Sequence, residues 1–294
     1  MNKVISRLLV FFIGIPVVIG IIYLPFFNHL PLHILICVLS ALGSAELYKI
    51  FSVNMKLHPK PVIMLGSILI PFVCAIYEIV PAFTGVDFPV TDDIITLTLI
   101  FVFLAVLAVE VFTARSFEIS NQRMSGSLFI IVYSGYLISF VSRMTTFTKD
   151  GKDISTALIS VFVLMVFFCD SLAWFFGILL GKNNKGFIKA SPNKSIAGFC
   201  GGFVGSILAG LLGYFIWPDV FSGSVIKVIA LSILIAFSGI VGDLTESIFK
   251  RCSGVKDSGH IIPGRGGVLD SIDSILMSAP VYYLLISILY GPLN

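Results

Sequence analysis

Long uninterrupted runs of apolar residues are the feature that most constrains this chain. About nine stretches are each long enough to cross a membrane as a helix, near 6–26, 30–50, 61–82, 94–113, 126–145, 155–180, 196–217, 225–250 and 268–290, since a span takes roughly 20 apolar residues. Only 12% of the 294 residues are charged, against about 25% in a typical soluble domain. This composition excludes a soluble globular protein, a disordered chain and a nucleic-acid binder, and it predicts an all-α polytopic integral membrane protein.

The basic residues predict how the chain is oriented. With the N-terminus inside, most of the 19 Lys and Arg fall in cytoplasmic segments, whereas Asp87, Asp92, Asp150 and Asp219 fall outside. Cytoplasmic loops of membrane proteins carry an excess of Lys and Arg. We therefore expect a cytoplasmic N-terminus and a C-terminus on the opposite side.

The two halves of the chain differ in charge. Residues 1–150 are apolar spans with few internal charges, and we predict that their helices form a lipid-facing scaffold. Residues 151–294 hold most of the acids within spans, many glycines and two strongly basic loops. We expect this second half to carry the functional site on its cytoplasmic side.

Five acidic side chains cluster near the cytoplasmic ends of three predicted helices. Asp243 and Glu246 are three residues apart on one helix, and Asp270 and Asp273 are three apart on the next, so each pair shares a helix face. Asp170 belongs to an earlier helix. Carboxylates gathered at low dielectric repel one another unless they are protonated or bridged by cations. Because oxygen-only ligands suit Mg²⁺, the pattern predicts a magnesium site.

Two other interpretations of the acids are weighed against this one. The carboxylates could form a salt-bridge lattice that holds the helices together, or relay protons or cations in a secondary transporter. A transporter predicts acids near the bilayer midplane and broken helices in both halves. Glu46 and Glu110, which lie elsewhere in apolar spans, are open to a packing role or to a place in a cavity.

Two basic loops accompany the acids on the same predicted side. The segment Ser258–Gly267 reads SGHIIPGRGG, and its glycines permit positive φ and leave N–H groups open ahead of a helix N-terminus, which is a geometry that binds anions. The segment Gly181–Gly198 reads GKNNKGFIKASPNKSIAG, and its lysines are open to a role as a solvated face attracted to anionic lipid. The first loop therefore predicts a phosphate site.

The stretch Ser247–Asp273, SIFKRCSGVKDSGHIIPGRGGVLDSID, resembles the signature of the phosphatidate cytidylyltransferase (CDP-diacylglycerol synthase) family. Residues that match the family pattern are Ser247, Lys250, Arg251, Lys256, Asp257, Pro263, Gly264, Gly266, Gly267, Asp270 and Asp273. Upstream, the segments starting at Gly242, Asp170 and Ser191 resemble the family elements G-D-x-x-E-S, D-[ST]-x-A-[YW]-x-x-G and S-P-K-K-T-x-x-G. The resemblance covers about residues 170–275.

Two residues depart from the family pattern. Arg265 stands where the family has His in P-G-H-G-G, and Ser271 stands where it has Arg in D-R-x-D. A guanidinium is therefore shifted along the sequence rather than lost, and we expect Arg265 to take over a phosphate contact.

The resemblance implies an enzyme of phospholipid biosynthesis. It implies a nucleotidyltransferase that makes CDP-diacylglycerol and pyrophosphate from CTP and phosphatidate with Mg²⁺, at two divalent-cation positions that Mn²⁺ can also fill. It further implies a multi-pass protein of the inner (cytoplasmic) membrane whose active site faces the cytoplasm. The alternative is a related CTP-using enzyme that acts on another lipid phosphate, and a homodimer is left open.

The same resemblance assigns roles to residues of this chain. Asp243 and Asp270 are the expected direct metal ligands, with Glu246 and Asp273 as ligands or their supports. The expected catalytic residues are these four acids together with Lys250 and Arg251. The expected substrate-binding residues are Asp170, Ser191, Lys194, Ser195, Ser247, Lys256, Asp257, Gly264, Arg265, Gly266 and Gly267.

Overall fold

The structure is a computed structural model that describes residues 14–86, 91–262 and 266–290. Eight helices within these residues are long and apolar enough to cross a membrane. This confirms the predicted all-helical, polytopic membrane fold. The predicted first span, 6–26, lies partly outside the described residues, and its described part contains the short helix α2 (Ile15–Ile22).

The long helices closely follow the predicted spans. They are α3 (Leu30–Phe51), α4 (Lys60–Thr84), α5 (Thr91–Thr113), a composite span Ser120–Thr146, α8 (Ser155–Leu179), α9 (Ile196–Ile216), α10 (Val225–Cys252) and α11 (Leu269–Tyr290). The composite span contains α6 (Ser120–Ile131), the π-helical turn η2 (Val132–Tyr136), α7 (Leu137–Arg143) and the 3₁₀ turn η3 (Met144–Thr146). Predicted and observed helix ends differ by only a few residues, except at the start of the composite span.

A small β-hairpin precedes α8. Its strands β1 (Thr148–Lys149) and β2 (Lys152–Asp153) are antiparallel, with Thr148 opposite Asp153. Asp150 and Gly151 between them both have positive φ, as the tight turns of such hairpins require. The hairpin is the only β-sheet among the described residues.

The chain divides into two compact units that are not its two sequence halves. The first unit combines Met1–Thr145 with Phe249–Ser271, and the second combines Thr146–Ile248 with Ile272–Asn294. The segment that joins α10 to α11 therefore groups with the N-terminal helices. The predicted division of roles between residues 1–150 and 151–294 stays a prediction.

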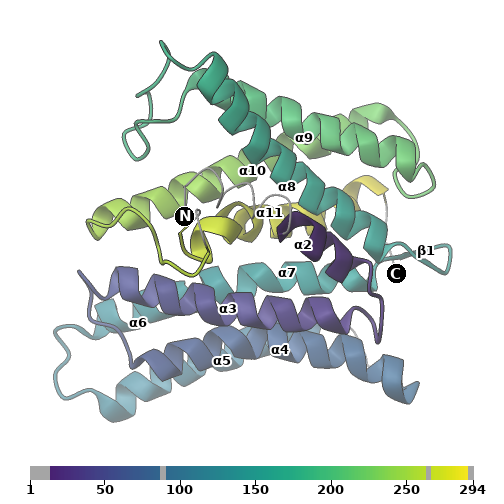
Figure 1. Cartoon of the computed structure of the whole chain (residues 1–294). Coiled ribbons are helices and arrows are strands. Elements are labelled where there is room, and N and C mark those ends of the chain that lie inside the picture. The colour runs from purple at the N-terminus through teal and green to yellow at the C-terminus, as the bar shows by residue number, and fades with distance from the viewer. Residues whose placement is uncertain (1–13, 87–90, 263–265, 291–294) are drawn as a thin grey trace. The chain divides into compact units, whose positions relative to one another are not determined.

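Small residues bring the helices of the first unit together. Figure 1 shows α3 and α4 running side by side, and the Ser40 hydroxyl on α3 donates a 3.0 Å hydrogen bond to the Ser67 carbonyl on α4. A Cβ placed on Gly135, in η2, would lie 2.9 Å from the Cα of Ser67. Such positions let helix backbones approach closely where lipid cannot drive association.

Phe249 anchors the end of α10 within the same unit. Its ring lies 5.3 Å from that of Phe51 on α3, 5.4 Å from Phe129 on α6 and 5.4 Å from Tyr133 in η2. All three pairs are close to edge-on, which is a favourable arrangement of aromatic rings. This cluster holds the end of α10 against α3 and the composite span.

Glycines of α9 determine the packing of the second unit. Figure 1 shows α8 and α9 lying against each other, and a Cβ on Gly201 would lie 2.7 Å from the Leu172 carbonyl of α8. On α11, the buried Tyr282 donates a 2.9 Å hydrogen bond to the Leu158 carbonyl of α8. A Cβ on Gly242 of α10 would overlap the backbone of Asp273 on α11. These contacts fix α8, α10 and α11, the helices that carry Asp170, Asp243, Glu246 and Asp273.

Candidate active site

Glu46, near the C-terminal end of α3, lies against the start of α11 in the first unit. Its Oε1 accepts a 3.0 Å hydrogen bond from the Val268 N–H, and its Oε2 accepts bonds of 2.8 Å from the Leu269 N–H and 2.9 Å from the Ser258 hydroxyl. The first N–H groups of a helix have no partner within the helix. Glu46 therefore caps α11 from a distant part of the sequence.

Asp270, in the first turn of α11, is held by the same loop. Its Oδ1 pairs with the Lys250 ammonium at 2.5 Å. Its Oδ2 accepts bonds from the Ser258 N–H at 2.9 Å, the Ser258 hydroxyl at 2.9 Å and the Gly267 N–H at 2.7 Å. Asp270 and Glu46 thus share Ser258 as a donor, and we call these three residues with Lys250 the loop cluster.

The glycine-rich turn differs from its expected form as an open anion cradle. The N–H groups of Gly267, Val268 and Leu269 donate to Asp270 and Glu46, and that of Gly266 donates to the Ile262 carbonyl at 3.0 Å. The expectation of open N–H groups is therefore wrong at these positions. The physical reason is that the protein supplies its own anions, two carboxylates, to the turn.

Gly266 is needed here for two reasons. Its φ of 114° is a conformation that residues with a side chain rarely adopt. A Cβ at this position would also lie 2.6 Å from Asp270 Oδ2. The substrate-binding role expected for Gly266 and Gly267 stays a prediction, and Gly264 and Arg265 lie outside the described residues.

A second group of acids lies in the second unit, and we call it the acid cluster. Asp273 on α11 is only 6% exposed, and the carboxylates of Asp243, Glu246 and Asp170 are near enough to repel it electrostatically. The Lys194 ammonium pairs with Asp243 Oδ2 and lies 5.9 Å from the Phe199 ring. Four of the five acids predicted to cluster therefore interact in this unit, whereas Asp270 belongs to the loop cluster.

Six further residues predicted for the site differ in how far they are exposed. Ser195 is the N-cap of α9, where its hydroxyl accepts a 3.1 Å hydrogen bond from the Gly198 N–H. Arg251, Lys256 and Asp257 are exposed. Ser191 and Ser247 are half-buried. Ser195 thus has a structural task, and the substrate contacts expected of all six residues stay predictions.

The acids fit a magnesium ion in the chemistry of their donors. Among the described residues, no group of three or more His, Cys, Asp or Glu side chains has the geometry of a metal site. Mg²⁺ is commonly held by only one or two carboxylates plus substrate phosphates. The carboxylate oxygens around Asp273 therefore fit a hard divalent cation such as Mg²⁺ in their donor chemistry.

A separate polar cluster in the first unit surrounds His58, in the loop between α3 and α4. Its Nε2 lies 2.9 Å from Glu110 Oε2, and its Nδ1 lies 3.0 Å from the Ser127 hydroxyl. Glu110 also contacts Arg123 and accepts a 2.6 Å hydrogen bond from Ser120. Burial lowers the pKa of His58 below its usual 6.5, although Glu110 opposes the shift. Glu110 is therefore a packing partner, which was one of its two expected roles.

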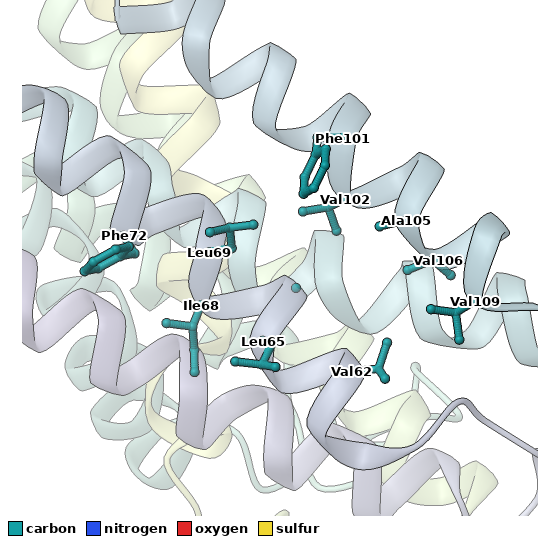
Figure 2. Close-up of a pocket in the computed structure, with 11 residues that line it drawn as sticks. Val62, Leu65, Ile68, Leu69, Phe72, Phe101, Val102, Ala105, Val106 and Val109 are labelled. Atoms are coloured by element: carbon teal, nitrogen blue, oxygen red, sulfur yellow. The ribbon is translucent and has the colours of Figure 1, made fainter.

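An apolar groove lies between α4 and α5. Figure 2 shows residues that line it, among them Leu65, Leu69 and Phe72 on α4 and Phe101 and Val106 on α5. The described lining carries no charged or hydroxyl side chain. The groove therefore suits hydrocarbon and offers no charged side chain to a phosphate.

Reasoning from the sequence missed the roles of Glu46 and Ser258. Glu46 is an acid in an apolar span, and such an acid is costly unless it is paired. This cost was the sequence signal that Glu46 has a partner. Its partners, however, are separated from it by 212 to 223 positions in the chain. Local spacing carries no information about such a pairing.

The fold and the two clusters define a multi-pass membrane protein with lysine-paired carboxylates on α10 and α11. The model of the cytidylyltransferase family matches residues 5–289, so the chain belongs to this family.

Three relatives are named phosphatidate cytidylyltransferase. The protein of Helicobacter pylori strain J99 is 42% identical over 135 residues, which cover 46% of this chain and 49% of the relative. The protein of Staphylococcus saprophyticus is 41% identical over 42% of this chain and 46% of the relative. That of Thermotoga maritima is 34% identical over 55% of this chain and 58% of the relative. The chain thus spans about half the length of the relatives it matches.

Proposed function

We propose that this protein transfers the cytidylyl group of CTP to phosphatidate, which gives CDP-diacylglycerol and pyrophosphate. The observation that carries the proposal is the pairing of a carboxylate with a lysine in both clusters, Asp243 with Lys194 and Asp270 with Lys250, in a chain of the cytidylyltransferase family. The names of the relatives supply the lipid substrate.

The proposed chemistry explains why acids and bases are interleaved. A phosphate oxygen of phosphatidate attacks the α-phosphorus of CTP. The bond between the α-phosphorus and the oxygen that bridges the α- and β-phosphates breaks, and pyrophosphate leaves. The nucleophile is already an anion near neutral pH, so no strong base is required. The main obstacle is the repulsion between two polyanions, and catalysis consists largely of positioning and charge neutralisation.

Lysine and arginine side chains of this chain would bind the phosphates. Arg251 and Lys256 are exposed and can reach an anion from water. Lys194 and Lys250 are oriented by Asp243 and Asp270. Charge-assisted hydrogen bonds to phosphate are roughly twice as strong as neutral ones, so each of these cations would stabilise negative charge on a bound phosphate.

The proposed metal ligands are the four acids Asp243, Glu246, Asp270 and Asp273. Asp243 and Asp270 would contact the metal directly, and Glu246 and Asp273 would contact it or support these two ligands. Bound Mg²⁺ would supply the charge neutralisation that brings the two anionic reactants together. The carboxylates would determine where a cation is held, and therefore where the phosphates can lie. Asp243 is well suited to binding a metal ion because its side chain is 39% exposed, so an ion can reach it from water.

The activity is tested on the detergent-purified protein with labelled CTP, phosphatidate and Mg²⁺. We expect labelled CDP-diacylglycerol that disappears with EDTA and returns with excess Mg²⁺ or Mn²⁺. Product formed only with a different lipid phosphate would replace phosphatidate as the substrate. Labelled product absent with every lipid phosphate would overturn the proposal. The size of the purified protein tests the homodimer.

The proposed location is the cytoplasmic membrane, with the active site facing the cytoplasm. Single cysteines at positions 150, 189 and 256 replace side chains that are all exposed, in a background without the native cysteines. In intact cells, an impermeant thiol reagent should label position 150 but not 189 or 256. The reverse pattern would contradict the proposed orientation.

A further inference from the structure

We propose that Glu46 is a positioning residue for the described parts of the loop between α10 and α11, residues 253–262 and 266–268. It would hold these parts in the shape that presents Asp270 and Lys250. The kinetic part of this inference rests on the proposed function, whereas its structural part does not.

The hydrogen bonds of Glu46 connect three points of the loop region at once. Its two oxygens accept from Ser258, Val268 and Leu269 at 2.8–3.0 Å. Val268 and Leu269 supply N–H groups at the start of α11 that have no partner within the helix. A negative charge is favourable at that end of a helix. One side chain thus fixes where the loop leaves Ser258 and where α11 begins.

The burial of Glu46 distinguishes positioning from direct catalysis. The residue is 7% exposed, and both of its oxygens already accept hydrogen bonds from the protein. A buried carboxylate with such partners is strongly held in place, because losing them would leave a charge at low dielectric. Glu46 would therefore act through the backbone that it orients.

Other residues at the end of α3 contact the start of the same loop. The Ser253 hydroxyl donates a 2.6 Å hydrogen bond to the Ile50 carbonyl, and the Asn54 side chain donates to the Cys252 carbonyl. Glu46 and Ile50 are four residues apart, so they lie on one face of α3. This face supports both ends of the loop.

Ser258 links Glu46 to the proposed chemistry. Its hydroxyl lies 2.9 Å from Glu46 Oε2 and 2.9 Å from Asp270 Oδ2, and Asp270 pairs with Lys250. Displacing the Glu46 carboxylate would release Ser258, and with it one of the groups that hold Asp270. The expected kinetic effect is therefore on kcat, with a smaller change in KM for CTP.

Glu46→Gln tests the inference through amide hydrogen exchange, resolved to single residues, in the full-length protein in detergent. A glutamine of the same shape presents an N–H₂ group to one of the N–H donors, so that donor loses its acceptor. We expect exchange at Val268 or Leu269 to become faster by about tenfold or more, which corresponds to one lost hydrogen bond to a charged group. The matched control is Glu110→Gln, which neutralises another buried acid of the same unit and should leave these two amides unchanged.

A second variant keeps the test decisive if Glu46→Gln does not fold. Glu46→Asp retains the charge but shortens the side chain by one methylene, so exchange at the same amides should rise by a smaller factor. Unchanged exchange in whichever of the two variants folds would overturn the inference, as would equal acceleration in Glu110→Gln. If the wild-type protein showed no transferase activity, the proposed function would fail, but the exchange result would still decide the role of Glu46.

Discussion

The loop cluster and the acid cluster accommodate their negative charges in opposite ways. In the loop cluster, Glu46 and Asp270 together accept hydrogen bonds or ion pairs from the Lys250 ammonium, the Ser258 hydroxyl and four backbone N–H groups. In the acid cluster, Asp273 is buried beside three other carboxylates, and the Asp243 side chain with its lysine partner is partly exposed.

This difference teaches how one kind of side chain serves two purposes. A buried carboxylate whose oxygens all accept hydrogen bonds fixes the backbone around it, because each bond would be costly to lose. A partly exposed carboxylate crowded by other acids is favourably placed for an incoming cation, which offsets the repulsion among the acids. We therefore expect the loop cluster to hold its proposed ligand Asp270 in a fixed position, and the acid cluster to present its proposed ligands more openly.

The largest expected effect comes from replacing one aspartate of each cluster. Asp243→Asn and Asp270→Asn should each reduce turnover more than about 100-fold, since each removes a proposed metal ligand. Only Asp270→Asn should accelerate amide exchange at Ser258 and Gly267, whose N–H groups it holds. Labelled-CTP assays and exchange measurements on both variants check this, and acceleration by Asp243→Asn would remove the distinction between the clusters.

A somewhat smaller effect is expected for Lys194→Met. The loss of a charged hydrogen bond to phosphate corresponds to roughly 10–150-fold in kcat/KM for CTP. The unfolding temperature should hardly change, because ion pairs this exposed contribute only about 0–1 kcal/mol. Lys189→Met, an exposed lysine of the same loop, is the control. A large loss of stability with unchanged kcat/KM would make Lys194 a structural residue.

Ser258→Ala should have a moderate effect. It removes the hydroxyl that contacts both Glu46 and Asp270 but keeps the Ser258 N–H bond to Asp270. We expect kcat to fall by about tenfold, in line with one lost hydrogen bond to a charged group. Ser253→Ala removes a hydroxyl that donates only to a backbone carbonyl, so its effect on kcat should be smaller. An equal fall in kcat in the two variants would mean that the hydrogen bonds from the Ser258 hydroxyl to the two carboxylates do not contribute to turnover.

The smallest expected effect lies outside both clusters, at His58. Its pKa is lowered in the folded protein, so the unfolded chain takes up a proton at this position more readily than the folded one. Stability should therefore decrease as the pH falls below the usual histidine value of 6.5. Thermal unfolding in detergent at several pH values checks this. His58→Gln should flatten the dependence, whereas His260→Gln, at an exposed position, should not.

The sequence allowed the fold to be predicted well because each span is a local property. The runs that ended near residues 50, 82 and 113 correspond to helices ending at Phe51, Thr84 and Thr113. The start of the composite span was placed at 126 instead of 120, because Ser120–Ser125 is polar and its helical state depends on packing. Eight of the nine predicted spans are thus present among the described residues.

The candidate site was predictable only in part. The spacing of Asp243 and Glu246 placed them on one helix face, and the structure adds that these acids also act on Asp273. The identity of the donors at the glycine-rich turn was not predictable, because Glu46 reaches it across more than 200 residues. A pattern reports the period of a helix, but it does not report which helix packs beside it.

The contact between Glu46 and the start of α11 has a consequence for biogenesis. During synthesis α3 is made long before Val268 and Leu269. The Glu46 carboxylate can therefore form its hydrogen bonds to these two residues only after most of the later helices have been made. Such non-local contacts form late. A nascent or truncated chain that stops before residue 268 lacks these two backbone donors and leaves in an apolar span an acid that is costly without partners.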